Sequence, residues 1–140
     1  MSSSNKSQSF ITHQLDLQNI SYQVLSEEEL KMIEFKWKEK FINKKTAPDL
    51  DKFKWHIFSF FPDKKNEGNN AILEYKKQYA SDIYIFNERL EYGLKIISPS
   101  ILPNIILSDF IDDVYICHYN MKWTYVIPHE YPEMGPYFKS

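Results

Sequence analysis

Two short β-rich runs near the C-terminus constrain the fold of this chain more than any other feature. They span residues 113–119 and 122–128, and Asn120-Met121 separates them. Two residues are the commonest connection of a β-hairpin, and Asn favours such turns. Neither run has a purely polar face when alternate residues are assigned to opposite sides. We therefore predict a C-terminal hairpin that is either covered on both sides or exposes aromatic side chains to a partner.

A capping box gives the clearest helix signal in the chain. In residues 26–29 (SEEE), the serine oxygen can accept a bond from the third amide after it, and Glu29 can reach back to the serine amide. Apolar residues then recur at spacings of three and four: Leu30, Ile33, Trp37 and Phe41. We predict a helix with one buried stripe. Its lysine-rich remainder is interpreted as a solvated face, in preference to a phosphate-binding or membrane-binding strip.

Shorter patterns predict the remaining elements. Alternating aromatic residues over 53–61 and 82–86 indicate two core strands, and an apolar side with an Asn cap indicates a helix over 70–80. Ser98-Pro99 is typical of a helix start, which predicts a short helix over 99–110. Gly93 is interpreted as a turn residue.

The N-terminal residues give the weakest signals. Residues 1–9 are polar and predict a flexible tail, and residues 10–25 alternate in a way that favours an extended segment able to pair as an edge strand. We therefore predict a single α+β domain over residues 10–140. It should hold an antiparallel or mixed sheet of about four or five strands, two or three flanking helices and the C-terminal hairpin.

Composition excludes several classes of protein. Aromatic residues make up 16% of the 140 residues, which indicates a globular chain with a substantial core. The only glycines are Gly68, Gly93 and Gly135, so neither a phosphate-binding loop nor a dinucleotide-binding turn can be written. Cys117 has no cysteine to pair with, and the chain opens without a signal-like apolar segment or a membrane-spanning run. We expect a cytoplasmic protein that does not enter a membrane.

The charge is unevenly distributed along the chain. Residues 31–54 hold eight lysines against four acids, whereas residues 80–140 hold eight acids against four basic residues. Arg89 is the only arginine, so the bidentate contacts typical of nucleic-acid readers are scarce, and nucleic-acid binding is not expected. The acidic half should attract a basic partner.

Histidines and carboxylates near the C-terminus are the candidates for chemistry. His129 and Glu130, together with His56 and His118, have the residue types of a metal site or of a general base. A helical H-E-x-x-H site would need histidine where Glu133 stands, and adjacent residues of an extended chain point in opposite directions. We therefore assign no catalytic residue, metal or cofactor, and keep His129, Glu130 and His56 as weak catalytic candidates.

The aromatic C-terminus has two interpretations. Tyr137 and Phe138, which follow Gly135-Pro136, are favoured as a latch that pins the chain end to the core. The alternative is a platform for a ligand. The candidate binding residues on this alternative are Trp123, Tyr125, His129, Glu130, Tyr131 and Tyr137.

Four short stretches carry a resemblance to a known family. They are residues 55–59 (WHIFS), 123–126 (WTYV), His129-Glu130 and residues 135–138 (GPYF). The chain resembles a small family of uncharacterised proteins of low-GC Gram-positive bacteria, classified as a domain of unknown function, over residues 26–138. The family implies no activity. Where the family pattern implies threonine before His129-Glu130, this chain has Pro128.

Three functional hypotheses remain open from the sequence. The first is a non-enzymatic cytoplasmic protein-binding module, similar in architecture to toxin-immunity proteins, whose acidic and aromatic C-terminal half binds a basic protein. The second is a small hydrolase or metal-dependent enzyme that uses His129 with Glu130 or His56. The third is an oligomerising module, and the sequence does not give the oligomeric state.

Overall fold

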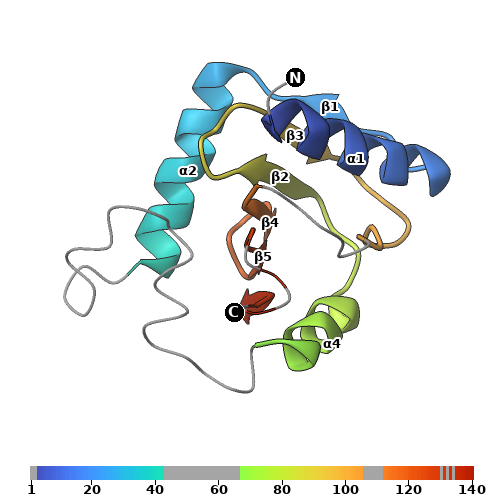
Figure 1. Cartoon of the computed structure of the whole chain (residues 1–140), viewed down its shortest axis with the longest axis vertical. Coiled ribbons are helices and arrows are strands. Elements are labelled where there is room, and N and C mark those ends of the chain that lie inside the picture. Colours follow the sequence, from blue (N-terminus) through green and yellow to red (C-terminus); the bar gives the residue numbers. More distant parts are fainter. Residues whose placement is uncertain (1–2, 43–66, 106–111, 130, 132, 134) are drawn as a thin grey trace.

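The fold is an antiparallel sheet with helices on both faces (Figure 1). This computed structural model describes residues 3–42, 67–105, 112–129, 131, 133 and 135–140. The strands are β1 (Gln23–Val24), β2 (Ile83–Asn87), β3 (Gly93–Ile96), β4 (Val114–His118), β5 (Thr124–Ile127) and β6 (Tyr137–Lys139). The helices are α1 (Ser3–Leu17), α2 (Glu27–Phe41) and α4 (Asn69–Lys77). The α+β prediction is confirmed.

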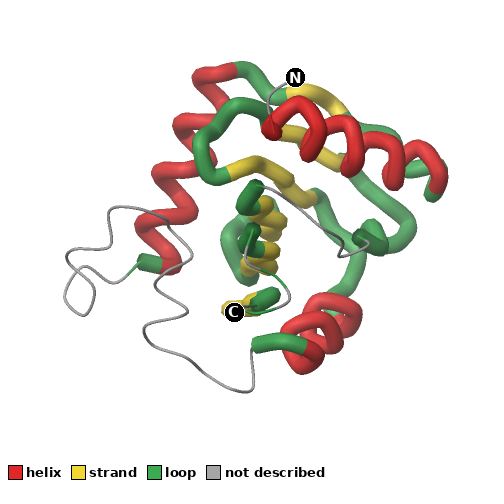
Figure 2. Tube along the Cα trace, in the orientation of Figure 1, coloured by secondary structure: helices red, strands yellow, loops and turns green. Residues whose placement is uncertain are grey.

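The described strands form one sheet in the order β1-β3-β2-β4-β5-β6, and all neighbours are antiparallel. This is slightly more than the four or five strands predicted. Figure 2 shows the strands following one another across the twisted sheet, with β1 at one edge and β6 at the other. The predicted strand over 53–61, with His56, lies outside the described residues.

Each face of the sheet packs against its own helices. One apolar cluster joins Ile11 and Leu15 of α1 and Tyr75 of α4 to the face that holds Ile116 and Tyr125. A second cluster packs the opposite face against α2, and its members include Trp37, Phe41, Tyr115, Cys117 and Val126. The hairpin is therefore covered on both sides, which decides between the two alternatives that its alternation left open.

The capping box and buried stripe of α2 are confirmed. The Ser26 Oγ accepts the Glu29 N–H at 3.2 Å, and the Glu29 carboxylate accepts the Ser26 N–H at 3.0 Å. Hydrogen bonding of the Glu29 carboxylate to the Ser26 backbone N–H, and then to the Ser26 side chain, lowers the pKa of Glu29 because it favours the charged form. Leu30, Ile33, Trp37 and Phe41 are all buried.

The extended segment expected at the N-terminus is wrong over residues 10–17, which belong to α1. The helix begins at Ser3, within the residues predicted as a tail. The physical reason is that Ile11 and Leu15 are four residues apart and reach the core together on one helical face, whereas Leu17 is exposed. The predicted edge strand is limited to Gln23–Val24.

Gly93 begins β3 and does not form the predicted turn. A Cβ atom at this position would lie 2.1 Å from Leu30 Cδ2, so glycine allows α2 to approach the strand closely. The sequence analysis therefore missed the hairpin that pairs β2 with β3.

The helix predicted after Pro99 is absent from the described residues 99–105. Residues 99–105 form an irregular segment, which we call the strap. The Tyr75 hydroxyl donates to the Pro103 carbonyl at 2.7 Å, and Gln18 exchanges two hydrogen bonds with the Asn104 backbone. These tertiary bonds satisfy the strap backbone without a helix.

The β4–β5 connection is longer than the two residues predicted. The His118 N–H donates to the Trp123 carbonyl at 3.1 Å, so the loop spans residues 119–122. Met121 explains the extra length, because its side chain is buried in the cluster beneath α2 and its φ is 57°. Within the described part of the chain, no helix has the length and apolar character needed to cross a membrane.

Candidate functional site

Three of the six candidate binding residues are core residues. Trp123, Tyr125 and Tyr137 are each no more than 3% exposed. Trp123 stacks against Phe138 with ring centroids 5.9 Å apart, and Tyr125 stacks on Tyr75 at 4.5 Å. The strand alternation therefore turns these three rings into the two apolar clusters.

Of the other candidates, the structure describes Tyr131 and His129. Tyr131 is half-buried and lines a cavity of about 240 Å³ beside α4. His129 is half-buried at the end of the sheet where β5 ends and β4 begins. Glu130 and His56 lie outside the described residues.

His129 is instead bound to Asp113, a partner that the sequence analysis did not assign to it. One Asp113 oxygen accepts the His129 backbone N–H at 2.7 Å and lies 2.8 Å from His129 Nδ1. The Asp113 side chain is 4% exposed and the His129 side chain 35%. When Nδ1 carries the proton of the neutral ring, this contact is a hydrogen bond, and Nε2 is the acceptor nitrogen.

This arrangement has a clear structural role. Because the same carboxylate oxygen holds both the backbone and the ring of His129, it anchors the turn that follows β5. A carboxylate behind an imidazole also occurs in general-base sites and behind metal-bound histidines.

His118 lies at the far end of β4, roughly 16 Å along the strand from Asp113. Among the described residues, no three His, Cys, Asp or Glu side chains are grouped as a metal site would require.

Carboxylates gather around Asn87 at the same end of the sheet. The buried Asn87 side chain accepts the backbone N–H groups of Glu91 and Tyr92, which fixes the β2–β3 turn. Its amide nitrogen then donates to Asp112 at 3.0 Å and to Glu91 at 3.4 Å. Two carboxylates from separate segments therefore share one amide group.

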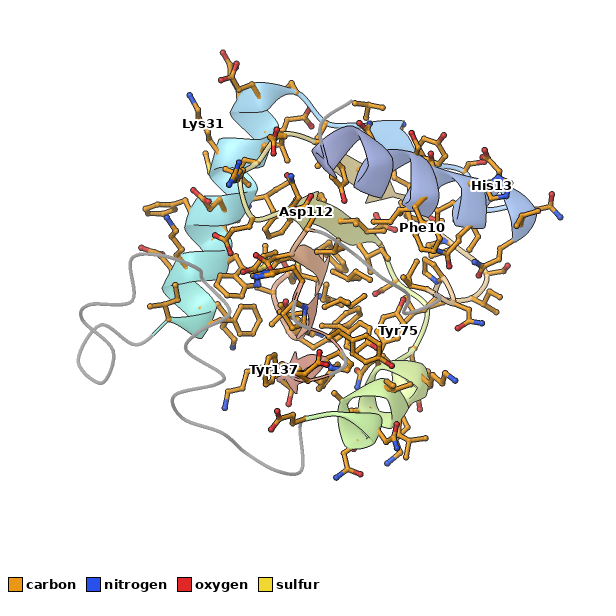
Figure 3. All side chains as sticks on the ribbon, in the orientation of Figure 1. Phe10, His13, Lys31, Tyr75, Asp112 and Tyr137 are labelled. Carbon is orange, nitrogen blue, oxygen red and sulfur yellow. The ribbon has the colours of Figure 1, made fainter. Side chains whose placement is uncertain are left out.

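Glu88 directly follows Asn87 in the chain, and we call Glu88, Glu91 and Asp112 together the acidic end. The Glu88 backbone N–H donates to the Asp113 carbonyl, and its carboxylate accepts a short hydrogen bond from the Tyr115 hydroxyl. Figure 3 shows Asp112 at the end of the sheet, away from Tyr75 and Tyr137. The acidic end therefore joins the β2–β3 turn to the start of β4.

The fold keeps Asp112 in a place that disfavours its charge. Its partial burial raises its pKa, the hydrogen bonds from Asn87 and Asp113 oppose the rise, and the nearby Asp113 and Glu91 add to it. Burial and like charges both favour the neutral acid. A cation that approached Asp112 would stabilise the charged form of its carboxylate.

His118, at the opposite end of the sheet, should make the stability of the fold depend on pH. Burial of the ring lowers the pKa of His118, repulsion from Lys122 adds to the effect and Asp82 opposes it. The unfolded chain therefore binds more protons than the folded chain just below pH 6.5, so stability is full above that pH and falls as the pH is lowered. His118 Nδ1 accepts the Asn120 N–H at 3.0 Å, which a doubly protonated ring cannot do.

We expect the unfolding free energy to fall between pH 7 and pH 5, and to fall less in His118→Asn, whose side-chain oxygen can replace Nδ1 as acceptor. The difference in slope should stay below about 1.4 kcal/mol per pH unit, the limit for one proton. Urea unfolding at several pH values measures it. His13→Asn, at an exposed position on α1, is the matched control. Equal slopes for wild type and His118→Asn would show that His118 does not titrate in this way.

The acidic end has a signal in the sequence that was read only as a charge balance. The role of Asn87 was not predicted. A polar Asn that follows an apolar strand is a common turn organiser. That signal could have indicated the β2–β3 turn, but not the approach of Asp112 to it.

Comparisons with known proteins place the chain in a family. Neither the curated proteins nor the solved structures gave a match. A family model described as "Domain of unknown function (DUF4275)" matches residues 10–138, which covers nearly the whole chain and extends the predicted resemblance toward the N-terminus. The chain therefore belongs to this family of domains of unknown function.

Proposed function

We propose that this chain is a non-catalytic protein-binding module whose acidic end binds a basic segment of a partner protein. The observation that carries the proposal is the convergence of Glu91 and Asp112 on one amide group. Complementary charge steers association and fixes the register of an interface. A lysine or arginine of the partner would relieve the repulsion that the fold builds in here.

The cost of charging Asp112 supports this function. Burial and the neighbouring carboxylates raise its pKa, yet its two oxygens are held by the Asn87 amide and the Asp113 N–H. The side chain is thus fixed in an electrostatically unfavourable position. Positions of this kind are enriched at functional sites, because a ligand can remove the unfavourable term.

The partner class follows from charge and from architecture. A basic protein fits the excess of acids over residues 80–140. The architectural analogy with immunity proteins suggests a secreted bacterial toxin as that partner. We propose that the interaction takes place in the cytoplasm, where a free thiol such as that of Cys117 is kept reduced.

The test compares two variants with equal charge. Glu91→Gln with Asp112→Asn removes two of the three negative charges of the acidic end, and Asn at position 112 keeps the oxygen that accepts the Asp113 N–H. Asp16→Asn with Glu28→Gln neutralises two exposed acids on α1 and α2. Each chain is immobilised, a partner is recovered from an extract of the native host, and the purified pair is measured by calorimetry.

We expect wild type and the α1/α2 control to bind the same basic partner. The acidic-end variant should bind it at least about tenfold more weakly, because two interfacial charges are lost. Recovery of no selective partner, or equal affinity for the two variants, would contradict the proposal.

A further inference from the structure

Two neighbouring cavities lie between α4 and the strap. One has a volume of about 460 Å³ and the other about 240 Å³, and both are lined by Tyr75, Lys76 and Asn104. Figure 3 shows Tyr75 between α4 and the sheet. Sites for small molecules usually have volumes of about 300–1,000 Å³. The two cavities together therefore have the size of a small-molecule site.

The charge of the two cavities has one sign. Of the described residues that line them, Lys76 alone is charged. Lys76 is exposed in the last turn of α4 and has no ion-pair partner within the described ranges. Its neighbour Lys77 pairs instead with Glu74 at 3.3 Å, and neither of these two residues lines a cavity. The lining therefore presents one positive charge that no carboxylate compensates.

The smaller cavity also holds polar side chains without a partner. Tyr125 is 2% exposed, yet it lines this cavity, and its hydroxyl has no hydrogen-bond partner among the residues that the structure describes. Burial raises the pKa of Tyr125 and the nearby Tyr131 adds to the rise, so the hydroxyl keeps its proton at neutral pH. Gln18 holds the Asn104 backbone, whereas the Asn104 side-chain amide is likewise unpaired in the described part of the chain. A buried donor without a partner is costly, and a ligand that brings an acceptor removes that cost.

The larger cavity supplies apolar area. Tyr79 is 91% exposed and Ile101 59%, and both line this cavity with the half-buried Leu102. An apolar group that occupied the cavity would remove part of this surface from water, which is favourable. Polar donors therefore line one cavity, and exposed apolar side chains line the other.

We propose that the two cavities form one binding site for a small monocarboxylate with a flat apolar body. The carboxylate would lie in the smaller cavity, where it would pair with Lys76 and accept hydrogen bonds from Tyr125 and Asn104. The apolar body would extend into the larger cavity against Tyr79 and Ile101. The site shares no residue with the acidic end, so it does not depend on the function proposed above.

Two other classes of small molecule fit the site less well. A phosphate ester carries about −1.5 to −2 charges at neutral pH, whereas the cavities offer a single cation. Lys76 also lies at the C-terminal end of α4, where the helix dipole disfavours additional negative charge. A neutral apolar molecule would leave the Tyr125 hydroxyl without an acceptor. A monocarboxylate matches the one cation and satisfies the hydroxyl.

The test titrates the full ¹⁵N-labelled chain with cinnamate, a flat monocarboxylate, with its uncharged analogue cinnamamide, and with phenyl phosphate. Amide chemical shifts give both the location of binding and the dissociation constant. Lys76→Met removes the charge and keeps a long apolar stem, and Tyr125→Phe removes only the hydroxyl. Lys77→Met is the matched control, because Lys77 is the adjacent exposed lysine and lines neither cavity. Circular dichroism shows that each variant is folded.

We expect wild type and Lys77→Met to bind cinnamate with a dissociation constant of about 1 mM or lower, with the largest shifts over residues 75–80 and 100–105. Lys76→Met should bind cinnamate about fivefold or more weakly, and Tyr125→Phe about threefold or more weakly. Wild type should bind cinnamamide and phenyl phosphate more weakly than cinnamate. Shifts that fall elsewhere, equal binding by Lys76→Met and Lys77→Met, binding of either analogue as tight as that of cinnamate, or no saturable shift would overturn the proposal.

Discussion

Replacement of Trp37 by alanine is expected to lower the unfolding free energy by about 3–5 kcal/mol, the range for removing a buried tryptophan. Trp37 is fully buried and packs edge-on against Tyr115 with centroids 5.2 Å apart. Its indole N–H donates to the Thr124 hydroxyl at 2.9 Å, and that hydroxyl donates to the Ile116 carbonyl. One side chain therefore joins α2 to the middle of the sheet, and its loss removes packing and a buried hydrogen bond together.

Urea unfolding followed by circular dichroism measures the change, and Trp37→Phe is the graded control. Phenylalanine keeps most of the ring contact but cannot donate to Thr124, so a loss of about 1–2 kcal/mol is expected. A change of less than about 1 kcal/mol in the unfolding free energy of Trp37→Ala would be close to the effect of a surface substitution. That result would show that Trp37 does not anchor α2 to the sheet.

Replacement of Phe138 by alanine should cost a similar amount, about 3–5 kcal/mol, because the last strand works as a latch. Phe138 is 3% exposed and stacks on Trp123, and β6 pairs with β5 from Thr124 to Val126. Tyr137 packs into the opposite cluster, so the two final aromatic residues pin both faces of the sheet edge. The measurement is again the unfolding free energy in urea.

Lys139→Ala is the matched control for the latch, since Lys139 belongs to the same strand and is exposed. It should change stability by no more than about 0.5 kcal/mol. If the aromatic C-terminus were a platform for a ligand, Phe138→Ala would have little effect on stability. If Phe138→Ala were as harmless as Lys139→Ala, the aromatic C-terminus would be a surface element and the latch would be wrong.

The elements that were predicted correctly are those specified by neighbouring residues. The capping box at Ser26 and the stripe from Leu30 to Phe41 lie within one helix, and all their determinants are local. The β4–β5 hairpin was recognisable for the same reason, because alternation within each run assigns its faces. Local patterns therefore identified α2, α4, β2, β4 and β5.

The elements that were missed depend on distant contacts. Gly93 appears as a turn residue until α2 is packed against it, since the close approach of Leu30 is what requires glycine there. The strap before residue 106 lacks its predicted helix because Tyr75 and Gln18 satisfy its backbone from other helices. Tertiary contacts of this kind override local propensity.

The candidate site shows the same limit. His129 was considered with its sequence neighbour Glu130, which lies outside the described residues, and its contact with Asp113, sixteen positions away, was not predicted. That contact follows from the register of β4 against β5, in which Val114 faces Ile127. The acidic end likewise needs the pairing of β2 with β4 to bring Asn87 beside Asp112.

Binding of a basic partner at the acidic end predicts a defined pattern of amide chemical-shift changes. The ¹⁵N-labelled chain is titrated with the purified partner recovered by wild type. We predict that the largest shifts fall on residues 87–92 and 112–113, and that they weaken as salt is raised, because the contact is electrostatic. Shifts that instead cluster on α4 or α1, or that do not respond to salt, would contradict the account.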